Sequence, residues 1–167
     1  MTVLDSTSSP AKGPGSVLSA SQETLANGHS LAHAIESKAQ SLAEEAIHPV
    51  TSEDGRPLDN RMLLALLACC YVRQSYRSAD VAAAARNDSA FCRRCRGAPP
   101  TASTICRFRG KNREALHACL VIGLRLQAEE KIQAGLICRI REASLQDEAH
   151  RRITMAMFID DMERDRN

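Results

Sequence analysis

An uninterrupted apolar run over residues 62–72 constrains the fold more than any other part of the chain. It contains only Met, Leu, Ala, Cys, Tyr and Val, so a helix made from it is apolar around nearly its whole circumference. The run is roughly half as long as a membrane-spanning helix requires. We therefore predict a buried central helix, with Asp59 or Asn60 as its N-cap and other helices around it.

The composition also favours helices over sheets. Hydrophobic residues make up 44% of the 167 residues, but aromatic residues make up only 3% and Trp is absent. Such a core consists mainly of Leu, Ala, Ile and Met, which are better helix formers than strand formers. We predict an all-α fold, a small helical bundle, with helices over 30–47 and 113–133. The segment 153–160 reads as a helix end or a single strand.

The distribution of turn and polar residues predicts three regions. Ser, Gly and Pro in residues 1–29 predict a disordered tail. Residues 30–136 form the helical domain, and residues 137–167 form a C-terminal tail that is helical or partly disordered. The N-terminus lacks the apolar stretch of a secretion signal, so we expect a cytoplasmic protein that does not enter a membrane, and its seven cysteines are expected to be reduced thiols.

Charge is strongly segregated along the chain. The net charge is +2, but residues 59–113 contain eleven Lys or Arg against three Asp. The remaining residues contain eleven basic and seventeen acidic side chains. Such segregation favours an anionic partner for the middle third, with nucleic acid first among them. The alternative is a basic face that only interacts with solvent.

Within this basic segment, residues 101–111 predict a two-faced helix. Thr101 or Ser103 starts it after a proline pair, and Ile105 and Phe108 face the core. Ser103, Thr104, Arg107 and Lys111 occupy the other side, while Arg109 lies nearer the apolar edge, where a phosphate contact or a structural role suits it. Hydroxyl, guanidinium and ammonium groups on one face are suited to reading bases and contacting phosphates in the major groove.

The preceding segments complete a helix-turn-helix-like unit in this interpretation. Ser78 is the predicted N-cap of a helix whose small face is Val81, Ala82 and Ala85. A short helix through 91–95 follows and ends at Gly97. The helix over 101–111 is then the second, groove-reading helix of the unit.

Three stretches in order resemble a known family: "GRPLDNRMLLALL", "YRSADVAAAARNDSAFCRRCRG" and "PPTASTICRFRGKNREAL". They are similar to the N-terminal domain of DDE-type insertion-sequence transposases of the InsH-like class. The resemblance covers residues 55–136, with Pro100 and the "CRRC" segment as departures. The matching positions are Gly55, Arg56, Pro57, Met62, Leu63, Leu64, Arg77, Ser78, Asn87, Phe91, Gly97, Pro99, Ser103, Thr104, Ile105, Arg107, Phe108 and Arg109.

The resemblance implies binding to the double-stranded DNA of the element's termini. The predicted DNA contacts are Ser103, Thr104, Arg107, Arg109, Lys111 and Arg77. Self-association and pairing with full-length transposase are the other partners it implies. An apolar face of residues 113–133, left exposed when the catalytic domain is absent, also predicts dimerisation or poor solubility.

The catalytic part of such an enzyme is not expected here. DDE transposases use three carboxylates, separated by long stretches of sequence, to hold two metal ions. Asp160 is the only candidate for the first of them, and "DDMERD" reads better as a soluble acidic tail. We predict no catalytic residue and an incomplete transposase, either a remnant or one frame of a split gene.

No metal or cofactor is predicted. Cys92 and Cys95 form one C-x-x-C, but a structural zinc site needs a second close pair. Cys69 and Cys70 lie in the buried run and are expected to pack as thiols. Two readings besides the transposase fragment stay open, namely a small helical interaction protein and a stand-alone helix-turn-helix repressor.

Overall fold

The computed structural model describes residues 30–94 and 99–166, and this part of the chain is predominantly helical. Its one β interaction is an isolated antiparallel bridge between Thr51 and Pro57, in the loop before the central helix. The predicted all-α fold is therefore confirmed. The tail predicted over residues 1–29 lies outside the described residues. No helix in the described part is long and apolar enough to cross a membrane.

The central helix is α2 (Asn60–Val72), as the apolar run predicts. Nine of its thirteen residues are buried. Asp59 is its N-cap, with a side-chain oxygen that accepts a hydrogen bond from the backbone N–H of Met62 at 3.0 Å. Burial on all sides explains why this helix has no polar face.

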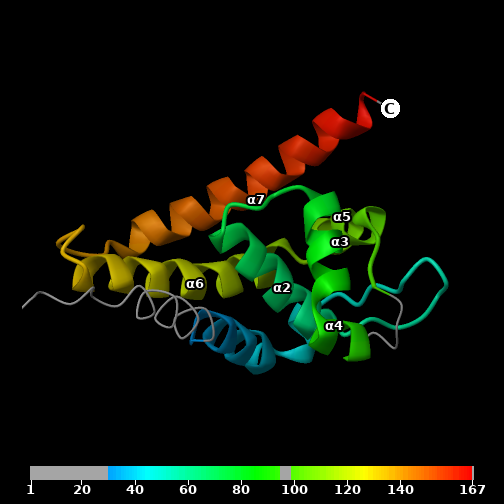
Figure 1. Ribbon diagram of the computed structural model, residues 1–167, viewed down its shortest axis with the longest axis horizontal. Coiled ribbons are helices and arrows are strands. Elements are labelled where there is room, and N and C mark those ends of the chain that lie inside the picture. The colour runs from blue at the N-terminus through cyan, green and yellow to red at the C-terminus, as the bar shows by residue number, and fades with distance from the viewer. Residues whose placement is uncertain (1–29, 95–98, 167) are drawn as a thin grey trace, which may run out of the picture.

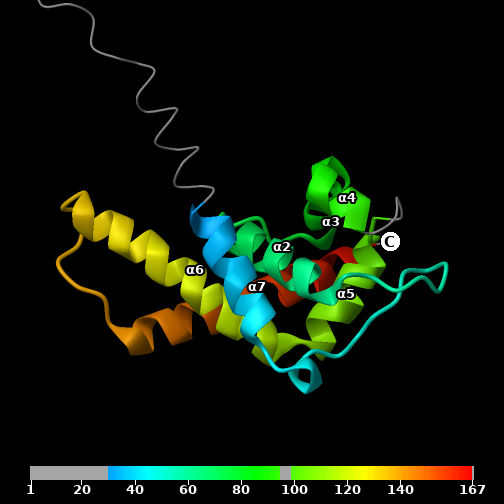
Figure 2. The same ribbon diagram turned by 90° about the horizontal axis from the view of Figure 1, so that it is seen from below.

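Two long helices lie on one side of α2. α6 (Arg113–Gln133) packs along α2, and α7 (Glu142–Arg164) packs on α6 as the outer layer (Figure 1). A helical segment over residues 30–41 lies beside α2 and α6 (Figure 2) and contributes Ile35 and Ala39 to the core. A 3-10 turn, η1 (Glu44–Ala46), follows it, so the helix predicted over 30–47 ends earlier than expected.

Three shorter helices lie at the opposite end of the molecule from the α6–α7 connection (Figure 1). They are α3 (Ser78–Asn87), α4 (Ser89–Arg94) and α5 (Ala102–Lys111). α5 packs chiefly on α3, whose small residues Val81, Ala82 and Ala85 are buried as predicted. Residues 88–101, including α4, separate the two packed helices, whereas a helix-turn-helix uses a turn of roughly three or four residues. The helix-turn-helix-like unit is therefore not confirmed.

The C-terminal segment is helical, which is one of the two predicted alternatives. α7 is a helix of 23 residues that includes the segment 153–160, so the strand alternative is excluded. Leu145, Ala149, Ile153 and Ala156 are buried in the same core as α2 and α6. The connection from α6 turns at Gly135, whose φ of 69° suits a glycine after a helix end.

Gly123 of α6 marks the closest approach of the helices. A Cβ at this position would lie 2.6 Å from Val72 Cγ2 and 2.8 Å from Ile35 Cδ1. The absence of a side chain thus allows α6 to contact both α2 and the segment 30–41.

We expect Gly123→Ala to lower the free energy of unfolding by about 1–3 kcal/mol, because the added methyl overpacks this contact. Alanine's helix propensity opposes this loss by only about 1 kcal/mol. Gly110→Ala is the matched control, since a Cβ there meets no atom within 4 Å, and it should leave stability unchanged or raised. Urea unfolding of both variants checks this, and equal stabilities would contradict the overpacking argument.

Candidate nucleic-acid interface

α5 has one buried and one exposed face. Thr101 caps its N-terminus, with Oγ1 accepting from the backbone N–H of Thr104 at 3.2 Å, as the sequence predicts. Ile105 and Phe108 are completely buried. Ser103, Arg107 and Lys111 are exposed, and their spacing of four residues places them in one row along the helix. Three of the six predicted DNA contacts therefore share a surface, which we call the α5 row.

The two basic members of the α5 row have no acidic partner in the described part of the chain. Arg107 Nη2 donates to the backbone oxygen of Thr51 at 2.8 Å, which tethers the side chain to the loop before α2. Neither Arg107 nor Lys111 forms an ion pair within residues 30–94 and 99–166. Their charges are thus available to an anionic partner.

Both ends of α5 are anchored. At the N-terminus, Thr101 Oγ1 donates to Glu53 Oε1 at 2.7 Å. At the C-terminus, the buried Asn112 accepts from His48 N–H at 2.7 Å and donates to the His48 carbonyl at 3.0 Å. Sequence reasoning missed Asn112. The one signal for it is its position as the single residue between two predicted helices, where a glycine or proline would be usual. These contacts keep the α5 row in one orientation.

Thr104 and Arg109 do not belong to the α5 row, and the predicted DNA contacts at these two positions are corrected. Thr104 is 0% exposed, with Oγ1 3.1 Å from Thr101 Oγ1. Arg109 is 3% exposed and points into the molecule. Burial against the core prevents either side chain from contacting DNA in this fold.

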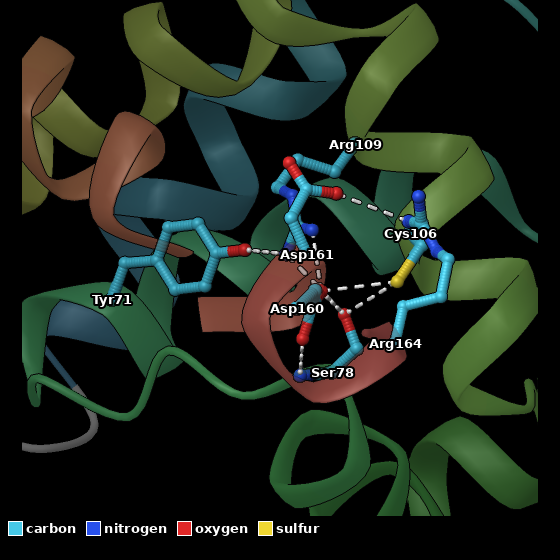
Figure 3. Close-up of polar contacts among 7 residues, drawn as sticks. All are labelled: Tyr71, Ser78, Cys106, Arg109, Asp160, Asp161 and Arg164. Atoms are coloured by element: carbon cyan, nitrogen blue, oxygen red, sulfur yellow. Dashed lines mark hydrogen bonds and ion pairs between the residues drawn. The ribbon is translucent and has the colours of Figure 1, made fainter. Parts of the chain in front are cut away.

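Arg109 instead forms a buried ion pair with Asp160 of α7 (Figure 3). Its Nη2 lies 2.5 Å from Asp160 Oδ2, and its Nη1 donates to Tyr71 Oη at 2.9 Å and to Ser78 Oγ at 3.3 Å. Its Nε has no hydrogen-bond partner among the described residues. The ion pair joins α5 to α7, with α2 and α3 contributing the hydroxyl groups around it.

Asp160 also caps the N-terminus of α3, although it lies 82 positions from Ser78 in the sequence. Its Oδ1 accepts from the backbone N–H of Ser78 at 3.1 Å, and its Oδ2 accepts from the Ser78 hydroxyl and, at 3.0 Å, from the Cys106 thiol. A carboxylate at a helix N-terminus is favoured by the helix dipole. The prediction that Ser78 is the N-cap was wrong by one residue, because Arg77 is the N-cap and the Ser78 hydroxyl bonds to Asp160.

The reading of "DDMERD" as a solvated acidic tail is corrected at Asp160, which is 7% exposed. The signal that could have identified it is periodicity. Asp160 continues the buried series Ala149, Ile153 and Ala156 at spacings of three and four residues. An acid in register with an apolar face indicates a buried partner of opposite charge.

Arg77, the sixth predicted DNA contact, is exposed but already forms an ion pair. Its Nε lies 2.6 Å from Glu163 Oε1 of α7. Both side chains are partly exposed, so the pair contributes little to stability. Glu163 therefore competes with a phosphate for the Arg77 guanidinium.

Two acidic groups of α7, Asp160 and Glu148, have depressed pKa values. Burial opposes ionisation of Asp160, yet hydrogen bonds from Cys106, Ser78 and Arg109 hold its pKa below the ordinary 3.8. Hydrogen bonds from Arg151 and Arg152 lower the pKa of Glu148 from 4.5 to about 2, although partial burial opposes this shift. Arg152 is itself buried and donates to the Tyr71 and Val72 carbonyls at the end of α2.

These shifts predict acid destabilisation with a defined sign. A carboxylate whose pKa is lower in the folded state stabilises the protein fully above its unfolded pKa, and that contribution is lost as the pH falls through the folded value. We expect urea midpoints to decline as the pH falls below 4.5 towards about 2. Glu148→Gln should flatten this decline. A midpoint independent of pH across that range would contradict the assignment.

The cysteines show no metal-binding arrangement in the described residues. No group of three potential ligands is present there, and Cys95 of the C-x-x-C lies outside it. Burial raises the pKa values of Cys69, Cys70 and Cys119 to about 11, so these thiols are not ionised at neutral pH. Cys69 and Cys70 pack in α2 as expected.

No protein-family model, curated protein or solved structure was found to match this chain.

Proposed function

We propose that the protein binds double-stranded DNA through the α5 row. The observation that carries the proposal is the exposure of Ser103, Arg107 and Lys111 in one line, with no ion-pair partner for Arg107 or Lys111 among the described residues. The row is about 12 Å long, because eight steps of about 1.5 Å each separate its first residue from its last. An α-helix fits the major groove of B-form DNA, where Arg, Lys and Ser serve as donors to bases and phosphates.

The anchoring of α5 supports this role. A recognition helix has to keep its side chains in position while the partner docks. Here the Thr101 and Asn112 contacts hold the two ends, and the Arg109–Asp160 pair holds the inner face. Arg109 thereby acts as a positioning residue for the α5 row rather than as a DNA contact.

The narrower proposal is that the DNA is the terminal repeat of an insertion sequence, and that the chain is the DNA-binding portion of a transposase. It rests on the resemblance of residues 55–136 in sequence. Selection from a pool of random duplexes tests it, because the enriched sequence should recur in inverted orientation at both ends of an element flanking the gene. Enrichment of an unrelated single site would favour a repressor.

DNA binding itself is tested by salt dependence. We expect fluorescence anisotropy with a labelled random-sequence duplex to show binding at ~50 mM salt and affinity that falls steeply as salt rises. Two or three neutralised phosphates give a log–log slope of about −2 to −3. Absence of binding at ~50 mM salt would discard the proposal and leave a charged helical protein.

A further inference from the structure

We infer that α7 pairs with the α7 of a second copy of this chain in antiparallel orientation. This inference concerns a different surface from the α5 row and does not depend on DNA binding. It starts from the large apolar side chains exposed in the described residues, three of which lie on α7: Met155, Phe158 and Met162, at 39%, 59% and 43% exposure.

The exposed apolar residues are on a different helix from the one the sequence suggested. α6 was expected to have an uncovered face, but α2 and α7 cover it on two sides, and none of the large exposed apolar residues lies within it. α7 shields α6 with its inner face and leaves its own outer face open (Figure 1). The self-association surface therefore moves from α6 to α7.

The outer face of α7 has the spacing of a helix-pairing seam. Arg151, Met155, Phe158 and Met162 of α7 and its C-cap Asp165 are all exposed and follow one another at intervals of four, three, four and three residues. This is the heptad spacing at which side chains of two helices interdigitate. We call these five residues the α7 seam.

The charges at the two ends of the seam favour a second copy of this chain as its partner. Its centre is apolar, one end carries Arg151 and the other carries Asp165. In an antiparallel pair with its two-fold axis at Phe158, Arg151 of each copy lies opposite Asp165 of the other. One self-complementary patch thus forms two ion pairs around a shared apolar centre, as an isologous dimer requires. A parallel pair would place like charges opposite each other.

The shape of the surface agrees with this register. A shallow apolar hollow, lined by His150, Arg151, Thr154, Met155 and Phe158, lies on the N-terminal side of Phe158. In the antiparallel register, Met162 of the second copy lies over Thr154 and enters this hollow. Arg151 uses its Nε and Nη2 to bond Glu148 at 2.7 Å, which leaves Nη1 for the second copy's Asp165.

A single helix pair is small for an interface, so we expect a dimer with a Kd of about 1–100 µM. Sedimentation velocity of the full chain from ~1 to ~200 µM should show a concentration-dependent shift from monomer to dimer. Phe158→Asp should weaken dimerisation at least ~10-fold without changing the circular dichroism, since Phe158 is mostly exposed in the monomer. Arg166→Ala, outside the seam, is the control and should leave the dimer unchanged.

A charge exchange tests the orientation. Arg151→Glu and Asp165→Arg should each weaken the dimer, because each places like charges opposite one another in an antiparallel pair. The double variant should restore the dimer, since Glu then faces Arg again. A wild-type chain that stays monomeric at ~200 µM overturns the inference, as does a dimer insensitive to Phe158→Asp. A dimer that the double variant fails to restore overturns the antiparallel arrangement.

Discussion

Replacing Asp160 with Ala is expected to lower the free energy of unfolding by about 3–5 kcal/mol, the usual cost of leaving one member of a buried ion pair without its partner. The substitution leaves the Arg109 guanidinium without its carboxylate partner. This residue is 3% exposed, and its Nε already has no hydrogen-bond partner among the described residues. It also removes the acceptor for the Ser78 N–H at the start of α3. Urea unfolding at neutral pH measures the loss.

Two variants make this prediction specific. Asp161→Ala, one residue away, removes an exposed acid that pairs with the exposed Arg164, and should change stability by less than about 1 kcal/mol. Combining Arg109→Met with Asp160→Leu should recover roughly half of the loss or more, because no buried charge then remains unpaired. Equal effects of Asp160→Ala and Asp161→Ala would contradict the buried ion pair.

The second large effect concerns the α5 row. Arg107→Ala is expected to weaken binding to a selected DNA duplex by about 1–3 kcal/mol if its guanidinium contacts a base edge. Lys111→Ala is expected to weaken binding to all duplexes alike and to reduce the magnitude of the salt slope by about 1, because its ammonium contacts a phosphate. Anisotropy titrations at several salt concentrations measure both effects.

The matched control for Lys111 is Lys131, which lies near the end of α6 at the opposite end of the molecule from α5 (Figure 1). Lys131→Ala removes the same charge and should leave the salt slope unchanged. If Lys131→Ala and Lys111→Ala weaken binding equally, the affinity comes from overall charge and not from the α5 row. Thermal unfolding should be unaffected by any of the three substitutions, since all three side chains are exposed.

Substitutions at the Arg109–Asp160 pair and substitutions in the α5 row therefore test two separate properties of the protein. Loss of the Arg109–Asp160 pair is expected to change the stability of the protein and the position of α5. Loss of the α5 row is expected to change only the proposed DNA contact. A variant such as Asp160→Asn that lowers both stability and DNA affinity would link the two layers through the position of α5.

Local sequence determined helices α2, α5 and α6 and most of their boundaries. The apolar run requires a helix without a polar face, and nine of the thirteen residues of α2 are buried. Thr101 and Asp59 start helices because their side chains satisfy free N–H groups within three residues. The inward direction of Ile105 and Phe108 follows from spacing alone, since a helix buries its apolar side.

Only the tertiary structure decided which charges face solvent. Arg109 and Asp160 are 51 positions apart; local sequence leaves Arg109 between a phosphate contact and a structural role, and places Asp160 in an acidic tail. Packing of α7 on α6 brings Asp160 to Arg109 and to the start of α3, which local spacing does not encode. Burial of a charge depends on a partner from a distant segment, whereas a helix depends on neighbours within four residues. Local sequence therefore determined the helices, and only the tertiary structure decided which charges are buried.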